Sequence, residues 1–211
     1  MTGIEVSGMG MFMGALAVAY LVPGPDMVLV LQTGAVRGRT VALLTAAGLA
    51  LARGVHVALA ALGLAALLQT APALFEAVRL AGAAYLVWLG IAIARAPSLV
   101  PPDAHGTATA PSALSAMGRG LVTNISNPKA LLFCSVLLPQ FIDTGAGSVT
   151  GQFMVLGMVL VALGAAFDVF YACAGGALGG WLARHPAAMA VQRWIFALLL
   201  IGFAARLAWV G

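Results

Sequence analysis

The sequence is dominated by long apolar stretches, and six of them reach the length of a membrane-spanning helix. A helix needs about 20 mostly apolar residues to cross the hydrocarbon core of a bilayer. The stretches that meet this requirement are residues 8–31, 41–68, 73–94, 117–139, 152–178 and 190–209. Hydrophobic residues make up 63% of the chain and charged residues 8%, whereas soluble domains contain about 45–50% and about 25%. The sequence therefore predicts an all-α integral membrane protein with six transmembrane helices.

The few charged residues indicate membrane topology. Lys and Arg are scattered in ones and twos between apolar stretches, whereas a nucleic-acid-binding protein gathers them on one face, so no nucleic-acid partner is predicted. Positively charged loops stay on the cytoplasmic side, and with six spans the connections on one side carry Arg37, Arg39, Arg95, Arg119, Arg184 and Arg193. This asymmetry predicts that both termini lie outside, although a re-entrant segment would change the count and turn the N-terminus inward.

A segment rich in Pro, Ser, Thr and Ala divides the chain into two halves. Residues 96–116 cannot bury enough apolar surface to fold, and they are predicted to be a flexible cytoplasmic linker. Residues 1–95 and 117–211 then hold three helices each, so the second half enters the membrane from the opposite side as an inverted repeat. An alignment of the halves places Pro25 on Pro128 and Asp26 on Lys129, and a similar match of the second helices sets Arg53 against Asp168.

Helix-breaking residues interrupt the first apolar stretch of each half. YLVPGPDMVLV (residues 20–30) contains Pro23, Gly24, Pro25 and Asp26, and ISNPKALLFCS (residues 125–135) contains Asn127, Pro128 and Lys129. Proline removes a backbone donor and clashes with the preceding turn, so both helices should be broken there. Non-helical backbone at membrane depth survives only where protein or a watery cavity covers it. The half-helix N-termini have free N–H groups that suit an anion such as an amino-acid carboxylate, which makes these seven residues the candidate substrate site.

Four ionisable side chains are predicted to lie at membrane depth, namely Asp26, Arg53, Lys129 and Asp168. Each costs at least about 2.5–3.5 kcal/mol at a helix centre unless it is paired or hydrated. For Arg53 and Asp168, a buried ion pair and a contact with substrate are equally good interpretations. Lys129 either belongs to the site or extends toward the cytoplasmic surface. Either Asp26 or Asp168 could carry a proton in exchange for substrate, while His56 is interpreted as a hydrogen-bonded packing residue.

Three stretches together resemble the LysE/RhtB family of amino-acid exporters. They are PGPDMVLVLQTGAVRGRTVALLTAAGLALARGVHVALAALGLAALL, LAGAAYLVWLGIAIAR and RGLVTNISNPKALLFCSVLLPQFID, which carry the PGP, AGAAYL-like and NPK motifs of that family. The resemblance implies proton-driven export of amino acids across the bacterial inner membrane, often by homodimers. Asp26 stands where many members have asparagine. Arg53 replaces an acidic residue common in exporters of basic amino acids, which favours a neutral or hydroxylated substrate such as threonine, homoserine or leucine.

Two other classes of function agree less well with the sequence. A membrane thiol-redox carrier can also have inverted three-helix halves, but it needs a cysteine in the first helix of each half, and only Cys134 is so placed. An enzyme is not predicted, because the chain shows no nucleophile motif, metal cluster or phosphate loop. The sequence accordingly predicts neither a cofactor nor a metal, and it favours a secondary transporter.

Overall fold

A computed structural model describes residues 6–22, 24–70, 72–95 and 112–209, and within these residues the secondary structure is entirely helical. The first part contains α1 (Val6–Leu21), α2 (Pro25–Arg37), α3 (Arg39–Thr70) and α4 (Pro72–Arg95). The second part contains α5 (Ala113–Ile125), α6 (Pro128–Leu132), the π-helical turn η1 (Phe133–Leu137), the 3₁₀ turn η2 (Leu138–Phe141), α7 (Val149–Arg184) and α8 (Pro186–Trp209). The predicted all-α membrane protein is thus confirmed in its class.

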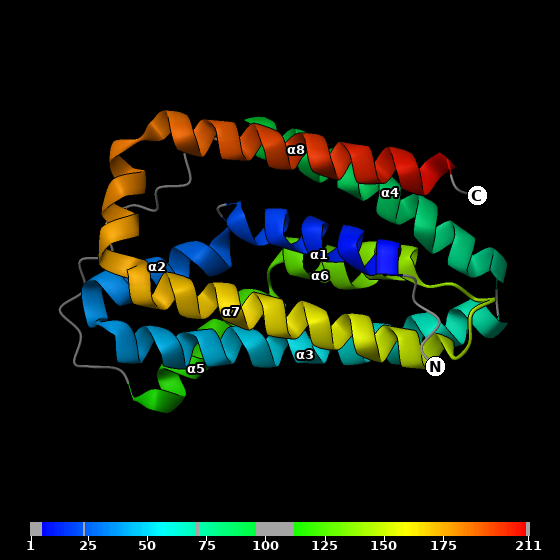
Figure 1. Cartoon of the computed structure of the whole chain (residues 1–211), viewed down its shortest axis with the longest axis horizontal. Coiled ribbons are helices and arrows are strands. Elements are labelled where there is room, and N and C mark those ends of the chain that lie inside the picture. The colour runs from blue at the N-terminus through cyan, green and yellow to red at the C-terminus, as the bar shows by residue number, and fades with distance from the viewer. Residues whose placement is uncertain (1–5, 23, 71, 96–111, 210–211) are drawn as a thin grey trace.

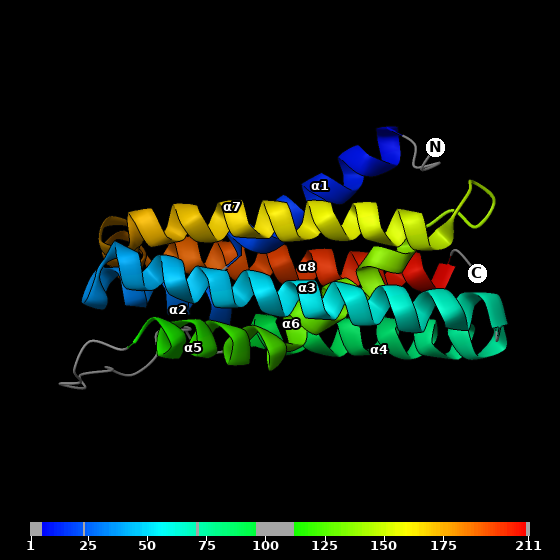
Figure 2. The same ribbon diagram turned by 90° about the horizontal axis from the view of Figure 1, so that it is seen from below.

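The helices lie roughly side by side along the long axis of the molecule (Figure 1). In Figure 1, α1 and α2 run in the same general direction toward one end of the bundle, α3 returns to the other end, and α4 comes back. The second part takes the reverse course, because α5 and α6 start from the end that α2 reaches, α7 returns to that end, and α8 leaves it again. Figure 2 shows that α1 also diverges from the bundle toward the N-terminus.

Both proline-containing stretches break their helices, as the sequence predicts. The axes of Gly8–Leu21 and Pro25–Arg37 meet at 52°, and those of Ala113–Ile125 and Lys129–Phe141 meet at 65°. By length and composition, two of the described helices can cross a membrane, Arg39–Gly63 and Val149–Gly175, or up to four if each bent pair is one span. The predicted spans 73–94 and 190–209 correspond to α4 and α8, in which the apolar helical stretches found are shorter, Leu80–Ala92 and Arg193–Ala205.

The half-helix that the sequence predicts after Pro128 is irregular. Regular α-helix lasts only to Leu132, and the chain continues as the π turn η1 and the 3₁₀ turn η2. Pro139 accounts for this change, because it has no N–H for the carbonyl of Ser135 and its ring would clash with that carbonyl in an α-helix. The start of the second half also differs from the prediction. Helix α5 begins at Ala113, before residue 117, because the Ser112 side chain accepts a hydrogen bond from Ser115 N.

Glycines allow the two halves to pack with their backbones in contact. A Cβ atom at Gly48 of α3 would overlap the carbonyl of Met117, and one at Gly120 of α5 would overlap the carbonyl of Thr45. Gly34 of α2 and Gly175 of α7 meet in the same way, since a Cβ at Gly175 would lie 3.0 Å from Gly34 Cα. These two close crossings place the broken helices of each half against the long second helix of the other.

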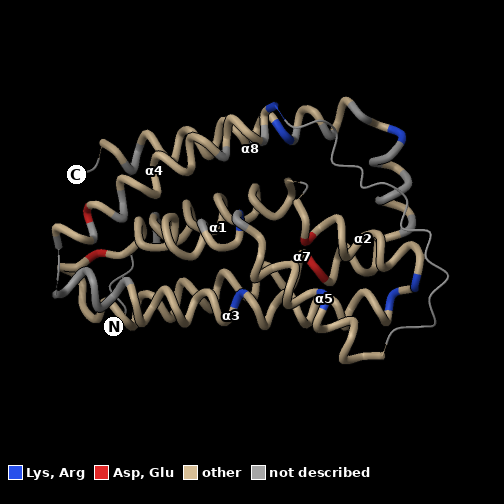
Figure 3. Tube along the Cα trace, turned by 180° about the vertical axis from the view of Figure 1, so that it is seen from behind, with Lys and Arg blue, Asp and Glu red and all other residues tan. Residues whose placement is uncertain are grey.

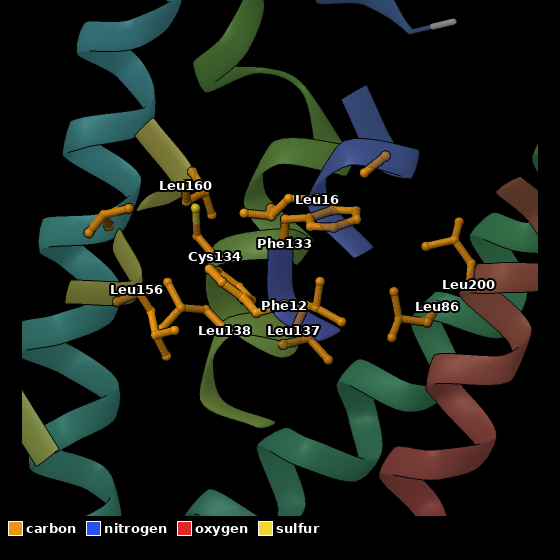
Figure 4. Close-up of a cluster of buried hydrophobic side chains, with 14 of the residues drawn as sticks. Phe12, Leu16, Leu86, Phe133, Cys134, Leu137, Leu138, Leu156, Leu160 and Leu200 are labelled. Atoms are coloured by element: carbon orange, nitrogen blue, oxygen red, sulfur yellow. The ribbon is translucent and has the colours of Figure 1, made fainter. Parts of the chain in front are cut away.

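Two apolar clusters fill the interior on either side of the breaks. The larger one joins α1, α3, α4, η1, η2, α7 and α8, with Phe12, Leu86, Phe133, Leu156 and Leu200 among its members (Figure 4). The smaller one joins α2, α3 and α7 and includes Met27, Val30 and Leu49. The basic residues gather toward the end of the bundle where α2 ends and α3 begins, whereas acidic residues lie at the opposite end and in the middle (Figure 3).

Candidate functional site

The two breaks lie against each other, and Asp26 is at the centre of the contact. Asp26 is the second residue of α2, where the partial positive charge of the helix N-terminus favours a carboxylate. Asn127 Nδ2, from the break between α5 and α6, donates to Asp26 Oδ1 over 2.9 Å, and Asn124 Nδ2 donates to Oδ2 over 2.6 Å. The predicted meeting of the two interrupted helices is therefore seen directly in side-chain hydrogen bonds.

Arg53 and Asp168 form a buried ion pair beside Asp26. Arg53 Nη1 and Nη2 donate to Asp168 Oδ2 and Oδ1 over 2.6 and 3.2 Å, and both side chains are 3% exposed. Arg53 Nη2 also reaches Asp26 Oδ2 at 3.3 Å, and the Asp26 side chain is 16% exposed. Of the two interpretations of Arg53 and Asp168, the geometry thus supports an ion pair, and it extends the pair to a third residue.

Tyr20 and Gly164 shape the space around Arg53. The Arg53 guanidinium carbon lies 5.2 Å from the centre of the Tyr20 ring, which is within the range of a cation–π contact. Tyr20 Oη donates to Leu160 O over 3.0 Å, and Tyr171 Oη donates to Tyr20 O over 2.8 Å. A Cβ at Gly164 would lie 2.9 Å from Arg53 Nη1 and 2.8 Å from Tyr20 Oη, so the glycine provides the room that both side chains occupy.

Lys129 binds the end of the opposite broken helix. Its Nζ donates to Ala19 O over 2.6 Å and to Val22 O over 3.2 Å. These carbonyls belong to the C-terminal end of α1, where a cation is favoured because backbone acceptors lack helical partners. Asn127 caps its own helix, since its Oδ1 accepts from Lys129 N over 3.0 Å. Lys129 therefore lies inside the protein at the site instead of extending to the cytoplasmic surface.

A small cavity separates these groups. It has a volume of about 40 Å³, and because one water needs about 10–15 Å³ of this kind of volume, it accommodates a few waters but no amino acid. Its wall contains four charged residues and a larger number of apolar ones. The charged groups are Asp26, Arg53, Lys129 and Asp168, and the apolar side includes Met27, Ala130, Phe133, Cys134 and Leu160.

Nearly all predicted site residues come together here. Gly24, Asp26, Asn127 and Lys129 line the cavity, and Pro25 and Pro128 open α2 and α6. Pro23 lies outside the described residues. His56 is buried with Nε2 3.3 Å from Asn124 O, in agreement with its interpretation as a hydrogen-bonded packing residue.

Sequence reasoning missed Tyr20, Asn124 and Tyr171. Asn124 could have been predicted from its position. It precedes Asn127 by three residues, about one helical turn, so its side chain falls on the same side of the broken helix. Tyr20 and Tyr171 could not, since an aromatic residue within an apolar stretch looks like any other packing residue. Within the described residues no group of His, Cys, Asp and Glu could hold a metal ion. The thiol-redox alternative gains no support, because both cysteines are free, Cys134 buried and Cys173 exposed.

Comparison with known proteins gives consistent matches over nearly the whole chain. The family model described as LysE type translocator matches residues 17–211. A leucine efflux protein of Enterobacter sp. (strain 638) is 36% identical over 188 residues, covering 89% of this chain and 89% of that protein. A leucine efflux protein of Klebsiella pneumoniae is 35% identical over 188 residues, covering 89% and 88%. An uncharacterized membrane protein of Pseudomonas aeruginosa is 32% identical over 191 residues, covering 89% and 88%. No solved structure matches the chain.

Proposed function

The chain belongs to the LysE type translocator family, and from this premise we propose that it exports neutral amino acids from the bacterial cytoplasm in exchange for protons. The family consists of amino-acid exporters that are multi-pass proteins of the bacterial inner membrane, so this chain is an amino-acid exporter of that membrane. The proposal goes further in naming the substrate class, the driving ion and the residues that act.

The observation that carries the proposal is the charged cavity between the two breaks. A zwitterionic amino acid needs a cation for its carboxylate, an anion for its ammonium group and an apolar surface for its side chain. Lys129 supplies the first, Asp26 the second, and the wall formed by Ala130, Phe133 and Leu160 the third. Because the cavity holds only a few waters as it stands, it has to widen when an amino acid enters.

The charge of the site favours a neutral substrate. Asp26 and Asp168 balance Arg53 and Lys129, so the formal charges of the four residues cancel. A zwitterion adds no net charge to such a site, whereas lysine or arginine would leave an uncompensated cation at membrane depth, which is costly. Leucine is the first substrate to test, because the apolar wall suits a branched aliphatic side chain and the relatives from Enterobacter and Klebsiella are named leucine efflux proteins. Threonine and homoserine remain the hydroxylated alternatives.

Six spans in two inverted halves complete the proposed architecture, with residues 1–95 as the first half and the second half starting at α5, a few residues before the predicted boundary at 117. Each bent pair then counts as one span, and α4 and α8 count as spans as well. The opposite courses of the helices in the two halves support this arrangement (Figure 1). The gathering of basic residues at one end supports a cytoplasmic location for that end (Figure 3), with both termini on the other side. The homodimer implied by the family resemblance stays a prediction.

Efflux from cells and vesicles tests the proposal. A strain that expresses the chain is challenged with toxic amounts of single amino acids or dipeptides, and resistance should appear for leucine and related neutral residues. In proteoliposomes, efflux of labelled leucine should be lost in the double variant Asp26→Ala, Lys129→Ala. Asp143→Asn is the matched control, because Asp143 is an exposed carboxylate outside the cavity. Equal efflux from the double variant and the control, at equal protein levels, would refute the proposed site.

A further inference from the structure

The side-chain amide of Asn124 has a hydrogen-bond partner for its nitrogen but none for its oxygen. Asn124 is fully buried on the last turn of α5. Its Nδ2 donates to Asp26 Oδ2 over 2.6 Å, but its Oδ1 is buried without a hydrogen-bond partner. Its main chain is held in place, because its carbonyl accepts from Asn127 N over 3.0 Å and lies 3.3 Å from His56 Nε2. The amide group is thus the part of the residue that can turn.

We propose that Asp26 is the carboxylate that takes up and releases the transported proton, and that Asn124 is the positioning residue whose amide turns to serve both forms of Asp26. This inference rests on the proposed function, since it assigns the proton of the proposed exchange to one atom. A proton from water binds Asp26 Oδ2 when the site is open to one side, and it returns to water when the site is open to the other. On uptake an O–H bond of a hydronium ion breaks as the O–H bond of Asp26 forms and a neutral water is left, and on release the same two bonds change in reverse.

Asp26 is better placed for this role than Asp168. Asp168 is clamped by two hydrogen bonds from Arg53 and is 3% exposed, so a proton would have to displace a bidentate cation and would have little access to water. Both carboxylates line the cavity, but Asp26 has a single, longer contact with Arg53 at 3.3 Å and is 16% exposed. Its remaining contacts are neutral amides, which do not require it to be charged.

An amide can match either form of a carboxyl group, provided that nothing fixes its other end. Ionised Asp26 accepts from Asn124 Nδ2, as in the structure. When Asp26 is protonated, its O–H group points at Asn124 Nδ2, which is also a donor, so the two hydrogens oppose each other. A half turn of the Asn124 amide brings Oδ1 to this place, and Oδ1 accepts the hydrogen bond from the Asp26 O–H. A fixed donor on Oδ1 would lock the amide in the first orientation, and Asn124 has none. The missing partner is therefore what leaves both orientations open.

Other titratable groups surround Asp26 and have to stay unchanged in any test. They come from five elements, α1, α3, α6, η1 and α7, and they are Tyr20, Arg53, His56, Lys129, Cys134, Asp168 and Tyr171. A substitution at Asn124 alters none of their ionisable atoms. It therefore isolates the contribution of the amide to the pH dependence of transport.

The test compares two transport modes in proteoliposomes that contain the full chain. Exchange of labelled leucine at equal pH needs no net proton movement, whereas accumulation under a pH gradient does. Asn124→Leu should lower the ratio of gradient-driven transport to exchange by about tenfold, the factor that corresponds to one buried hydrogen bond, and flatten the pH profile. Gln140→Leu is the matched control, because Gln140 also has a buried amide oxygen without a partner but does not line the cavity. An equal ratio in both variants would refute the role of Asn124.

Infrared difference spectra of the purified protein at low and high pH test the proton site without transport. All six Asp and Glu side chains contribute carbonyl bands to these spectra, so the informative signal is the component that is lost in Asp26→Asn. This component should be present in the unmutated protein and in Asp168→Asn, and it should shift in Asn124→Leu. Spectra of Asp26→Asn that equal those of the unmutated protein would overturn the assignment. Absence of leucine exchange in the unmutated protein would instead contradict the proposed function, and the infrared result would still decide which residue binds the proton.

Discussion

Replacement of Gly120 by alanine should separate the two helices that hold the site together. A Cβ at this position would overlap Thr45 O and lie 3.0 Å from Leu49 N, and all of these atoms belong to the rigid backbone of α3. A separation of about 1 Å is enough to stretch the 3.3 Å contact between Asn124 O of α5 and His56 Nε2 of α3, which helps to position Asn124, beyond hydrogen-bonding distance. Overpacking of this kind costs about 1–3 kcal/mol. We therefore expect both a lower free energy of unfolding and a loss of leucine transport.

Gly118→Ala supplies the control within the same helix. A Cβ at Gly118 meets no atom within 4 Å, and alanine is favoured over glycine in a helix interior by about 0.5–1 kcal/mol. Gly120→Ala should thus lower the free energy of unfolding and Gly118→Ala should raise it, with about 1.5–4 kcal/mol between the two variants. Reversible unfolding in mixed detergent micelles measures this difference, and proteoliposome efflux measures transport. If the two variants have the same free energy of unfolding, α3 and α5 do not pack as described, and this contact does not position Asn124.

Three further substitutions probe the charged groups, each by the same unfolding and efflux measurements. Arg53→Met should lower the free energy of unfolding by about 3–5 kcal/mol because it leaves a buried carboxylate unpaired. The double variant Arg53→Met, Asp168→Leu should recover most of that loss. A double variant as unstable as the single one would contradict the ion pair. Gly164→Ala should reduce efflux, since it displaces the ends of the Arg53 and Tyr20 side chains. Gly54→Ala, which has open space around it, should leave efflux unchanged and raise the free energy of unfolding by about 0.5–1 kcal/mol, as expected for alanine in a helix interior. Lys129→Met should abolish efflux and lower stability by about 1–3 kcal/mol, because two buried carbonyls lose their donor; retained efflux would remove Lys129 from the site.

Much of the site was predictable because polar residues at membrane depth need a reason to be there. The breaks at Pro25 and Pro128 were visible as residues that cannot continue a helix. The cost of leaving either charge alone in an apolar interior made a pairing of Arg53 with Asp168 one of two equally good interpretations. Alignment of the two halves set these residues against each other, and the structure joins them at 2.6 Å.

The remaining features depend on packing that no local pattern reveals. The π turn after Leu132 results from Pro139 seven residues further on, and the sequence signal there is one proline in an apolar stretch. The close approach of α3 and α5 depends on Gly48 and Gly120, which look like the other glycines until the partner backbone is known. For the same reason, the charge of Arg53 alone is not enough to explain a preference for a neutral substrate. Arg53 is neutralised by Asp168 and Asp26, so discrimination against basic amino acids has to come from the charge balance of the whole cluster.

The contacts across the breaks make each broken helix depend on the other. The carbonyls at the end of α1 are satisfied by Lys129, and Asp26 at the start of α2 is held by Asn124 and Asn127. Unpaired backbone groups at this depth cost several kcal/mol each, so neither break is stable unless the other half provides these donors. We predict that a substrate carboxylate which draws Lys129 Nζ away from Ala19 and Val22 loosens the end of α1, the helix that diverges from the bundle toward the N-terminus (Figure 2). The contacts of Tyr20 with Leu160 and Tyr171 would then be left to hold this end of α1 at the cavity.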